Sequence, residues 1–142
     1  MAYQATITWK EGIHFEGVSA DQTVQMDGIP ESGGQALGFS PMRLLLVALG
    51  GCTGMDVISV LKKMREDVTF FDIEVNGTRA AEHPKVYTDI EVVYRVRGRN
   101  LNRADVEKAV NLSVEKYCSV EGMLKKAVNM TNRIVIEDEA GG

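Results

Sequence analysis

Apolar and polar positions alternate in several segments, and this pattern predicts β-strands. The clearest case is residues 85–98, where apolar positions on one face alternate with charged positions on the other, as in a strand with one buried face. A similar alternation over residues 71–75, with turn-forming residues 77–84 between, predicts a hairpin. The predicted apolar face of residues 85–98 consists of Val86, Ile90, Val92, Tyr94 and Val96. Further strands are predicted at residues 4–9, 13–18, 23–26 and 133–137.

A continuous apolar run predicts a long helix over residues 40–65. Ser40 is a good N-cap, and Pro41 suits the first helical position. Residues 44–49 are all apolar, which predicts a helix that is buried on every side in its first half. The second half becomes amphipathic and ends in cations that suit a helix C-terminus.

A second helix is predicted to begin at Asn102 and to run to about Cys118. Ser119 then reads as the N-cap of a short helix that continues through Ala127. The expected core stripe of the second helix is Val106, Ala109, Val110 and Tyr117.

The order of the predicted elements indicates an α+β fold in a single domain. Strand hairpins come first, followed by the long helix, a hairpin, two helices and a last strand, which is not an alternating βαβ pattern. Residues 28–40, rich in glycine, are predicted to form a loop, and they lack the Gly-Lys-Ser/Thr of a phosphate-binding loop. We therefore expect one domain over residues 1–142, with a β-hairpin region and loop at 1–39 and both cysteines in the region 40–142.

Charge and motifs narrow the expected function. The net charge of −4 argues against nucleic acid or an anionic membrane as the main partner. The start MAYQATITW has no secretory pattern, and the apolar run 44–52 is shorter than the roughly 20 residues that cross a bilayer. With no C-x-x-C and no H-E-x-x-H, no metal site or cofactor is expected. A cytoplasmic protein is predicted, in which two cysteines are more often free or redox-active than structural.

Cys52, in the predicted long helix, is the first candidate for chemistry. A free cysteine has a pKa of about 8.5 and is only a few per cent thiolate at pH 7, so a reactive thiolate needs that pKa lowered by about two units. The helix dipole fades within the first turn, whereas Cys52 lies about 16 Å along the axis from Pro41. Gly50 and Gly51 permit two alternatives: a break that starts a new helix at Cys52, or bare backbone that another segment can approach closely.

Arg43 and Cys118 each have two interpretations. Arg43 occupies an early helical position where the dipole disfavours a cation, so it either serves a site or is exposed at a small cost. It lies about 13.5 Å along the axis from Cys52 and could reach that thiol only across a symmetric dimer. Cys118 is either a small buried hydrophobe or a second thiol that resolves oxidised Cys52.

Three segments resemble the OsmC/Ohr family, the osmotically inducible protein C and organic hydroperoxide resistance proteins. They are PMRLLLVALGGCTGMDVISVLKKMR, HPKVYTDIEVVYRVRG and LSVEKYCSVEGMLKKA, within a region that runs from Pro41 to Ala127. The chain looks closest to the OsmC-like branch. The resemblance implies an OsmC-like fold, in which two long central helices are enclosed by antiparallel β-sheets in an intertwined homodimer.

The resemblance also implies a cysteine-based peroxidase that reduces organic hydroperoxides in an oxidative stress response, without a cofactor. Cys52 would be the peroxidatic cysteine and form a sulfenic acid. Cys118 would be the resolving cysteine and form a disulfide, which an external dithiol such as a lipoyl-protein reduces.

The sequence departs from the family pattern at one charge pair. Family members typically have Glu at the position of Arg43 and an Arg in the N-terminal segment, where Lys10 is the only Lys or Arg before Arg43. Either Arg43 supplies the missing cation to the partner's Cys52, or the site is degraded. In the second case the chain is a non-catalytic module that binds an apolar ligand at the dimer interface.

Overall fold

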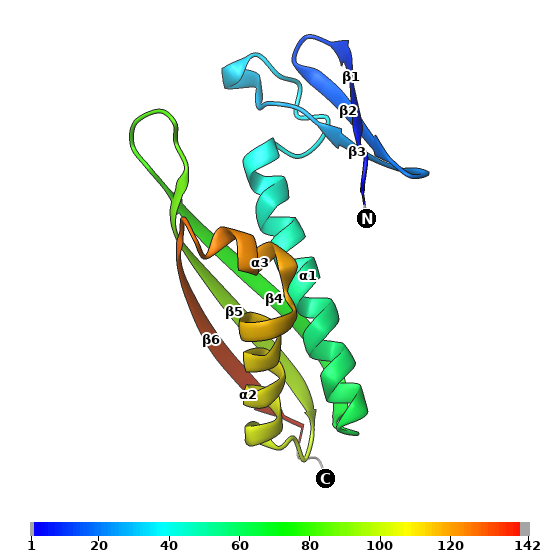
Figure 1. Cartoon of the computed structure of the whole chain (residues 1–142), viewed down its shortest axis with the longest axis vertical. Coiled ribbons are helices and arrows are strands. Elements are labelled where there is room, and N and C mark those ends of the chain that lie inside the picture. The colour runs from blue at the N-terminus through cyan, green and yellow to red at the C-terminus, as the bar shows by residue number, and fades with distance from the viewer. Residues whose placement is uncertain (1, 140–142) are drawn as a thin grey trace. The chain divides into compact units, whose positions relative to one another are not determined.

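The computed structural model describes residues 2–139, and its contacts divide the chain into two units, residues 1–45 and 46–142 (Figure 1). The first unit holds a three-stranded sheet, and the second holds a three-stranded sheet with helices. The predicted α+β class is therefore confirmed.

The sheet of the first unit consists of three antiparallel strands in the order β1-β2-β3. Their bounds are β1 Thr6–Glu11, β2 His14–Ser19 and β3 Gln22–Met26. The predicted loop after them contains one short 3₁₀ turn, η1, at Pro30–Ser32. The sequence pattern located all three strands within two residues.

Asp27 organises the loop that follows β3. Its carboxylate accepts hydrogen bonds from the backbone N–H groups of Gly28, Gln35 and Leu37, at 2.7, 3.1 and 3.2 Å. Burial alone would raise the pKa of Asp27, but these donors outweigh it and hold the pKa below its usual value. One buried carboxylate thus holds the backbone of residues 28–37 in place through three hydrogen bonds.

Helix α1, Pro41–Lys63, is unbroken through Gly50 and Gly51, so a new helix start at Cys52 is excluded. Its buried residues recur every four positions: Leu49, Thr53, Val57 and Leu61. Val47 is 51% exposed, so the predicted burial on every side is wrong for a single copy of the chain. The apolar run exceeds what one chain can cover, because only one face of α1 packs within the chain.

Glycines let α1 approach strand β4, Asp67–Arg79, closely. A Cβ atom at Gly50 would lie 3.3 Å from Val75 Cγ2, and one at Gly54 would lie 3.0 Å from Ile73 Cδ1. The alternative in which the bare backbone at Gly50 lets another segment come close is therefore correct. The side chains that approach are apolar residues of β4 and not a basic residue.

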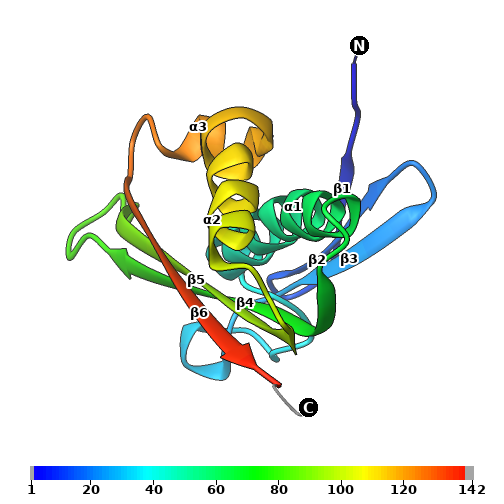
Figure 2. The same ribbon diagram turned by 90° about the horizontal axis from the view of Figure 1, so that it is seen from below.

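The second sheet has β5, Tyr87–Arg99, at its centre, between antiparallel β4 and parallel β6, Asn129–Asp138. The predicted antiparallel arrangement is therefore wrong for β6, because two helices connect β5 to β6 and return the chain to the same end of the sheet. The predicted apolar face is buried except for Val86, which lies in the loop before β5 and is 50% exposed. Beyond Leu45, α1 lies beside α2 over one face of this sheet (Figure 2).

Helix α2, Arg103–Leu112, begins as predicted at Asn102, whose side chain accepts from the N–H groups of Ala104 and Asp105. One π-helical turn, η2, follows at Ser113–Tyr117, before helix α3, Ser119–Leu124. The wider turn changes the helical register, so Tyr117 is 49% exposed and not part of the core stripe. The predicted N-cap of α3, Ser119, is wrong: the N-cap is Cys118, one residue earlier.

By length and composition alone, α1 could cross a membrane, since it has 23 residues and a mean hydropathy of 2.0 over its most apolar window. The uninterrupted apolar run 44–52 is shorter than this window, because the window also includes small and polar residues such as Thr53 and Gly54. The core helix of a soluble protein passes the same test. Here one face of α1 packs against β4 and is hydrogen-bonded to β5 through Thr53, and 22% of its apolar window is buried within the chain.

Candidate active site

Both cysteines lie in the second unit, and the structure brings them together. The Sγ atoms of Cys52 and Cys118 and a carboxylate oxygen of Asp56 all lie within 4.8 Å of one another. Neither cysteine forms a disulfide; Cys52 is half-buried, whereas Cys118 is 4% exposed. Sequence reasoning missed Asp56, although its i, i+4 spacing from Cys52 places the two on one face of α1.

The π turn and the start of α3 fix the position of Cys118. Its N–H donates to the carbonyl of Ser113 at 2.8 Å, which closes the π turn, and its Sγ accepts from the backbone N–H of Glu121 at 3.4 Å. Burial raises the pKa of the Cys118 thiol to about 12, and the nearby Cys52 and Glu121 side chains add to this rise. Cys118 is therefore a protonated thiol at neutral pH.

A buried chain of hydrogen bonds connects the Asp56 carboxylate to Ser113, Thr53 and Tyr94. Thr53 Oγ1 lies 2.8 Å from both Tyr94 OH and Ser113 Oγ, and Ser113 Oγ donates to Asp56 Oδ2 at 3.0 Å. Thr53, Tyr94 and Ser113 are completely buried. The chain of bonds ties α1 to β5 and η2, and it holds the Asp56 carboxylate beside the thiols.

Tyr94 remains protonated in this network. Burial raises the pKa of its hydroxyl to about 12, partly offset by the hydrogen bond with Thr53. The hydroxyl can therefore donate to Thr53 over the whole neutral range, and Thr53 can in turn donate to Ser113, which donates to Asp56. This direction of donation ends at the only carboxylate of the network.

Glu121 is a buried carboxyl in the first turn of α3. It is 1% exposed, and its Oε2 has no hydrogen-bond partner among residues 2–139. Burial raises the pKa of Glu121, against an opposing effect of Lys125. Sequence reasoning missed this residue, because with the N-cap predicted at Ser119 it lies two positions after the cap and not at the third, where a capping box has Glu.

The third predicted site residue, Arg43, lies in the first turn of α1 and is exposed. It belongs to the first unit, whereas the two thiols belong to the second. Its predicted action on the partner's Cys52 stays a prediction.

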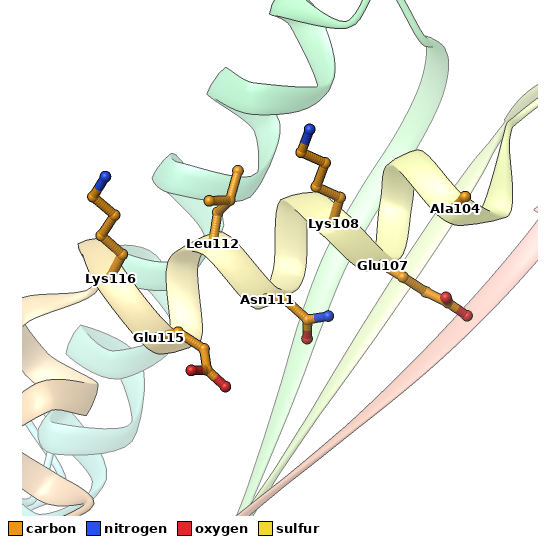
Figure 3. A pocket seen from close by; sticks show the side chains of 7 residues that line it. All are labelled: Ala104, Glu107, Lys108, Asn111, Leu112, Glu115 and Lys116. Carbon is orange, nitrogen blue, oxygen red and sulfur yellow. The ribbon is translucent and has the colours of Figure 1, made fainter.

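A separate pocket of about 520 Å³ lies along α2 and η2, and Figure 3 shows the side chains around it. None of Cys52, Asp56 and Cys118 lines it. The lining residues are Ala104, Glu107, Lys108, Asn111, Leu112, Glu115 and Lys116. The pocket is thus not part of the thiol site.

The chain is similar to several known proteins over nearly its whole length. Residues 32–132 match the family described as OsmC-like protein. Protein YhfA of Escherichia coli K12 is 45% identical over 130 residues, which are 91% of this chain and 94% of YhfA. A hypothetical protein from Aquifex aeolicus has a TM-score of 0.87 at 32% identity, with 98% of each chain covered. An organic hydroperoxide resistance protein OsmC from Legionella pneumophila has a TM-score of 0.68 at 15% identity, with 95% of this chain and 97% of that chain covered, and so shares the fold.

Proposed function

Because the chain belongs to the family of OsmC-like proteins, we propose that it is a thiol peroxidase that reduces organic hydroperoxides to alcohols. The observation that carries this proposal is the approach of the Cys52 and Cys118 sulfurs to within 4.8 Å. The family includes organic hydroperoxide resistance proteins, and two of these have the same fold as this chain.

The two thiols have different roles, which follow from their exposure. Cys52 is half-buried and can meet a substrate, whereas Cys118 is buried and its pKa of about 12 keeps it protonated. Since the thiolate is the nucleophile, Cys52 attacks first. Cys118 is then the resolving cysteine.

In the first step the Cys52 thiolate attacks the terminal oxygen of the hydroperoxide. The O–O bond breaks, the alkoxide takes a proton and leaves as alcohol, and Cys52 is oxidised to a sulfenic acid. Cys118 Sγ then attacks the Cys52 sulfur, water leaves, and a disulfide forms. Because that bond is about 2.05 Å long, the sulfurs need to approach by less than about 3 Å from the observed limit of 4.8 Å. An external dithiol, such as a lipoyl-protein, returns both thiols by exchange.

A homodimer is part of this proposal. Val47 and Met55 of α1 are 51% and 74% exposed, and a second copy of the chain would cover such apolar side chains.

Arg43 of one copy would then stabilise the thiolate of the partner's Cys52. On this view Arg43→Ala slows alkylation of Cys52 at neutral pH without dissociating the dimer; an unchanged rate would place Arg43 on the surface. A cytoplasmic location suits the two reduced thiols.

Rapid mixing of the reduced protein with cumene hydroperoxide tests the peroxidase. Wild type is expected to consume one equivalent and form the disulfide. Cys118→Ser, the matched control, should also consume one equivalent but leave a Cys52 sulfenic acid that dimedone traps. Cys52→Ser should consume none. If Cys52→Ser reacted as fast as wild type, Cys52 would not be the peroxidatic cysteine. If wild type consumed no hydroperoxide, a non-catalytic module that binds an apolar ligand would be the better account.

A further inference from the structure

Asp56 has no part in the peroxidase steps, yet it lies within 4.8 Å of both sulfurs. We propose that the reduced site binds a thiophilic divalent cation, with zinc as the best fit, through Cys52 Sγ, Cys118 Sγ and one Asp56 oxygen. The binding does not depend on peroxidase activity. Its consequence for the thiols, a competition between metal and hydroperoxide, does rest on the proposed function.

The spacing of the three donor atoms suits a tetrahedral ion. With Zn–S bonds of about 2.3 Å and Zn–O bonds of about 2.1 Å, tetrahedral donors lie about 3.5 to 3.8 Å apart. The observed separations are at most 4.8 Å, so closing the site needs movements of about 1 Å. Rotation of the Cys52 and Asp56 side chains on α1 can provide these movements without a change of the backbone.

The donor types also suit zinc. Both cysteines would bind as thiolates, so the ion would displace the proton of Cys118. Two thiolates favour a soft or borderline ion over magnesium or calcium, and a carboxylate oxygen is also a zinc ligand. Ser113 Oγ donates to Asp56 Oδ2 at 3.0 Å, which orients the carboxylate and leaves its other oxygen for the ion. Outer contacts of this kind are typical of metal sites and tune their affinity.

A buried carboxyl group beside the thiols is a second, independent observation. Glu121 is 1% exposed, and its Oε2 has no hydrogen-bond partner in the described part of the chain. It is close enough to act on the Cys118 thiol electrostatically. A cation at the thiols would favour the ionised form of this carboxyl group, against the protonated form that burial favours. Because Cys52 is half-buried, water can take the remaining position on the ion.

Metal and hydroperoxide would then exclude one another. A bound ion occupies both sulfurs, so the Cys52 thiolate is no longer a free nucleophile. Conversely, formation of the disulfide removes two of the three donors and releases the ion. The site would therefore hold zinc while reduced and lose it when oxidised.

Titration of the reduced, metal-free full-length protein with zinc, against a chromophoric chelator, tests the proposal. One ion per chain is expected. Ser113→Ala should weaken binding about 10- to 100-fold, and Cys52→Ser, Cys118→Ser or Asp56→Ala should weaken it more. Glu107→Gln, which removes an exposed carboxylate on α2, is the matched control and should bind like wild type. Cobalt, used as a probe, should give a sulfur-to-metal absorption that falls to about half in Cys118→Ser.

The result that would overturn the proposal is zinc affinity that is unchanged in Cys52→Ser, or that falls equally in Glu107→Gln. The same protein is assayed for hydroperoxide consumption with excess chelator present. Zinc binding without hydroperoxide consumption would refute the peroxidase and leave the metal site standing. Hydroperoxide consumption without zinc binding would refute the metal site alone. Zinc retained by the disulfide form would exclude the two sulfurs as ligands.

Discussion

Replacement of Thr53 by valine should destabilise the protein more than its small change in shape suggests. Valine has nearly the shape of threonine but no hydroxyl. Thr53 is completely buried, and its Oγ1 lies 2.8 Å from both Tyr94 OH and Ser113 Oγ. The variant leaves the Tyr94 hydroxyl, also completely buried, without this partner, whereas Ser113 keeps its bond to Asp56.

The expected cost can be worked from these contacts. One buried hydroxyl left unpaired costs about 1–3 kcal/mol, and a second lost hydrogen bond costs about 1 kcal/mol. We expect Thr53→Val to lower the free energy of unfolding by about 2–4 kcal/mol. Thr53→Ser, the matched control, keeps the hydroxyl and loses one methyl group, at a cost of about 1 kcal/mol.

Urea denaturation of the reduced protein at fixed concentration measures these differences, since an associating chain has a concentration-dependent stability. The double variant Thr53→Val/Tyr94→Phe removes both hydroxyls and should be less destabilised than the sum of the two single changes. The reasoning is refuted if Thr53→Val costs no more than Thr53→Ser, or if the two changes are additive.

Three other predictions concern single polar side chains. The raised pKa of Glu121 implies stability that is present below the ordinary value of 4.5 and lost as pH rises through the folded pKa; Glu121→Gln should remove this loss, so urea unfolding curves of variant and wild type should diverge towards pH 8, and parallel curves would contradict it. Asn102→Ala should cost about 1 kcal/mol through the lost cap, measured by thermal unfolding, while Asn102→Asp retains it. The lowered pKa of Asp27 implies stability present above 3.8 and lost as pH falls through the folded pKa; Asp27→Asn should therefore be less stable than wild type at pH 7 but not in strong acid.

Local patterns in the sequence predicted most of the fold. Alternation located the hairpin of β4 and β5, and Asn102 marked the start of α2, because strand periodicity and helix capping act between residues close in the chain. The motifs around Cys52 and Cys118 also led to the correct family. The two sulfurs lie together as that resemblance implies, although their chemistry stays a prediction.

Other features depend on contacts between distant residues, which local patterns cannot predict. Thr53 and Ser113 are 60 positions apart, so nothing near either one in the sequence indicates that they form a hydrogen bond. The π turn that changes the register of Tyr117 has no sequence signal that separates it from an α-turn. The exposed side chains of Leu45 and Val47 on α1 show that an apolar run in the sequence does not indicate which of its residues the chain itself buries.

The parallel pairing of β5 and β6 has a consequence for how the chain acquires its structure. Asp89 lies opposite Asn129, and Gly98 lies opposite Asp138, so each pair joins positions 40 residues apart. During synthesis from the N-terminus, the helices α2 and α3 and the π turn between them are made after β5 and before its second neighbour, β6. Such distant pairing slows folding, and until β6 pairs, one edge of β5 has unpaired backbone N–H and C=O groups that can pair with another chain. Shortening the last strand should therefore reduce the yield of folded protein before it changes any reaction at the thiols.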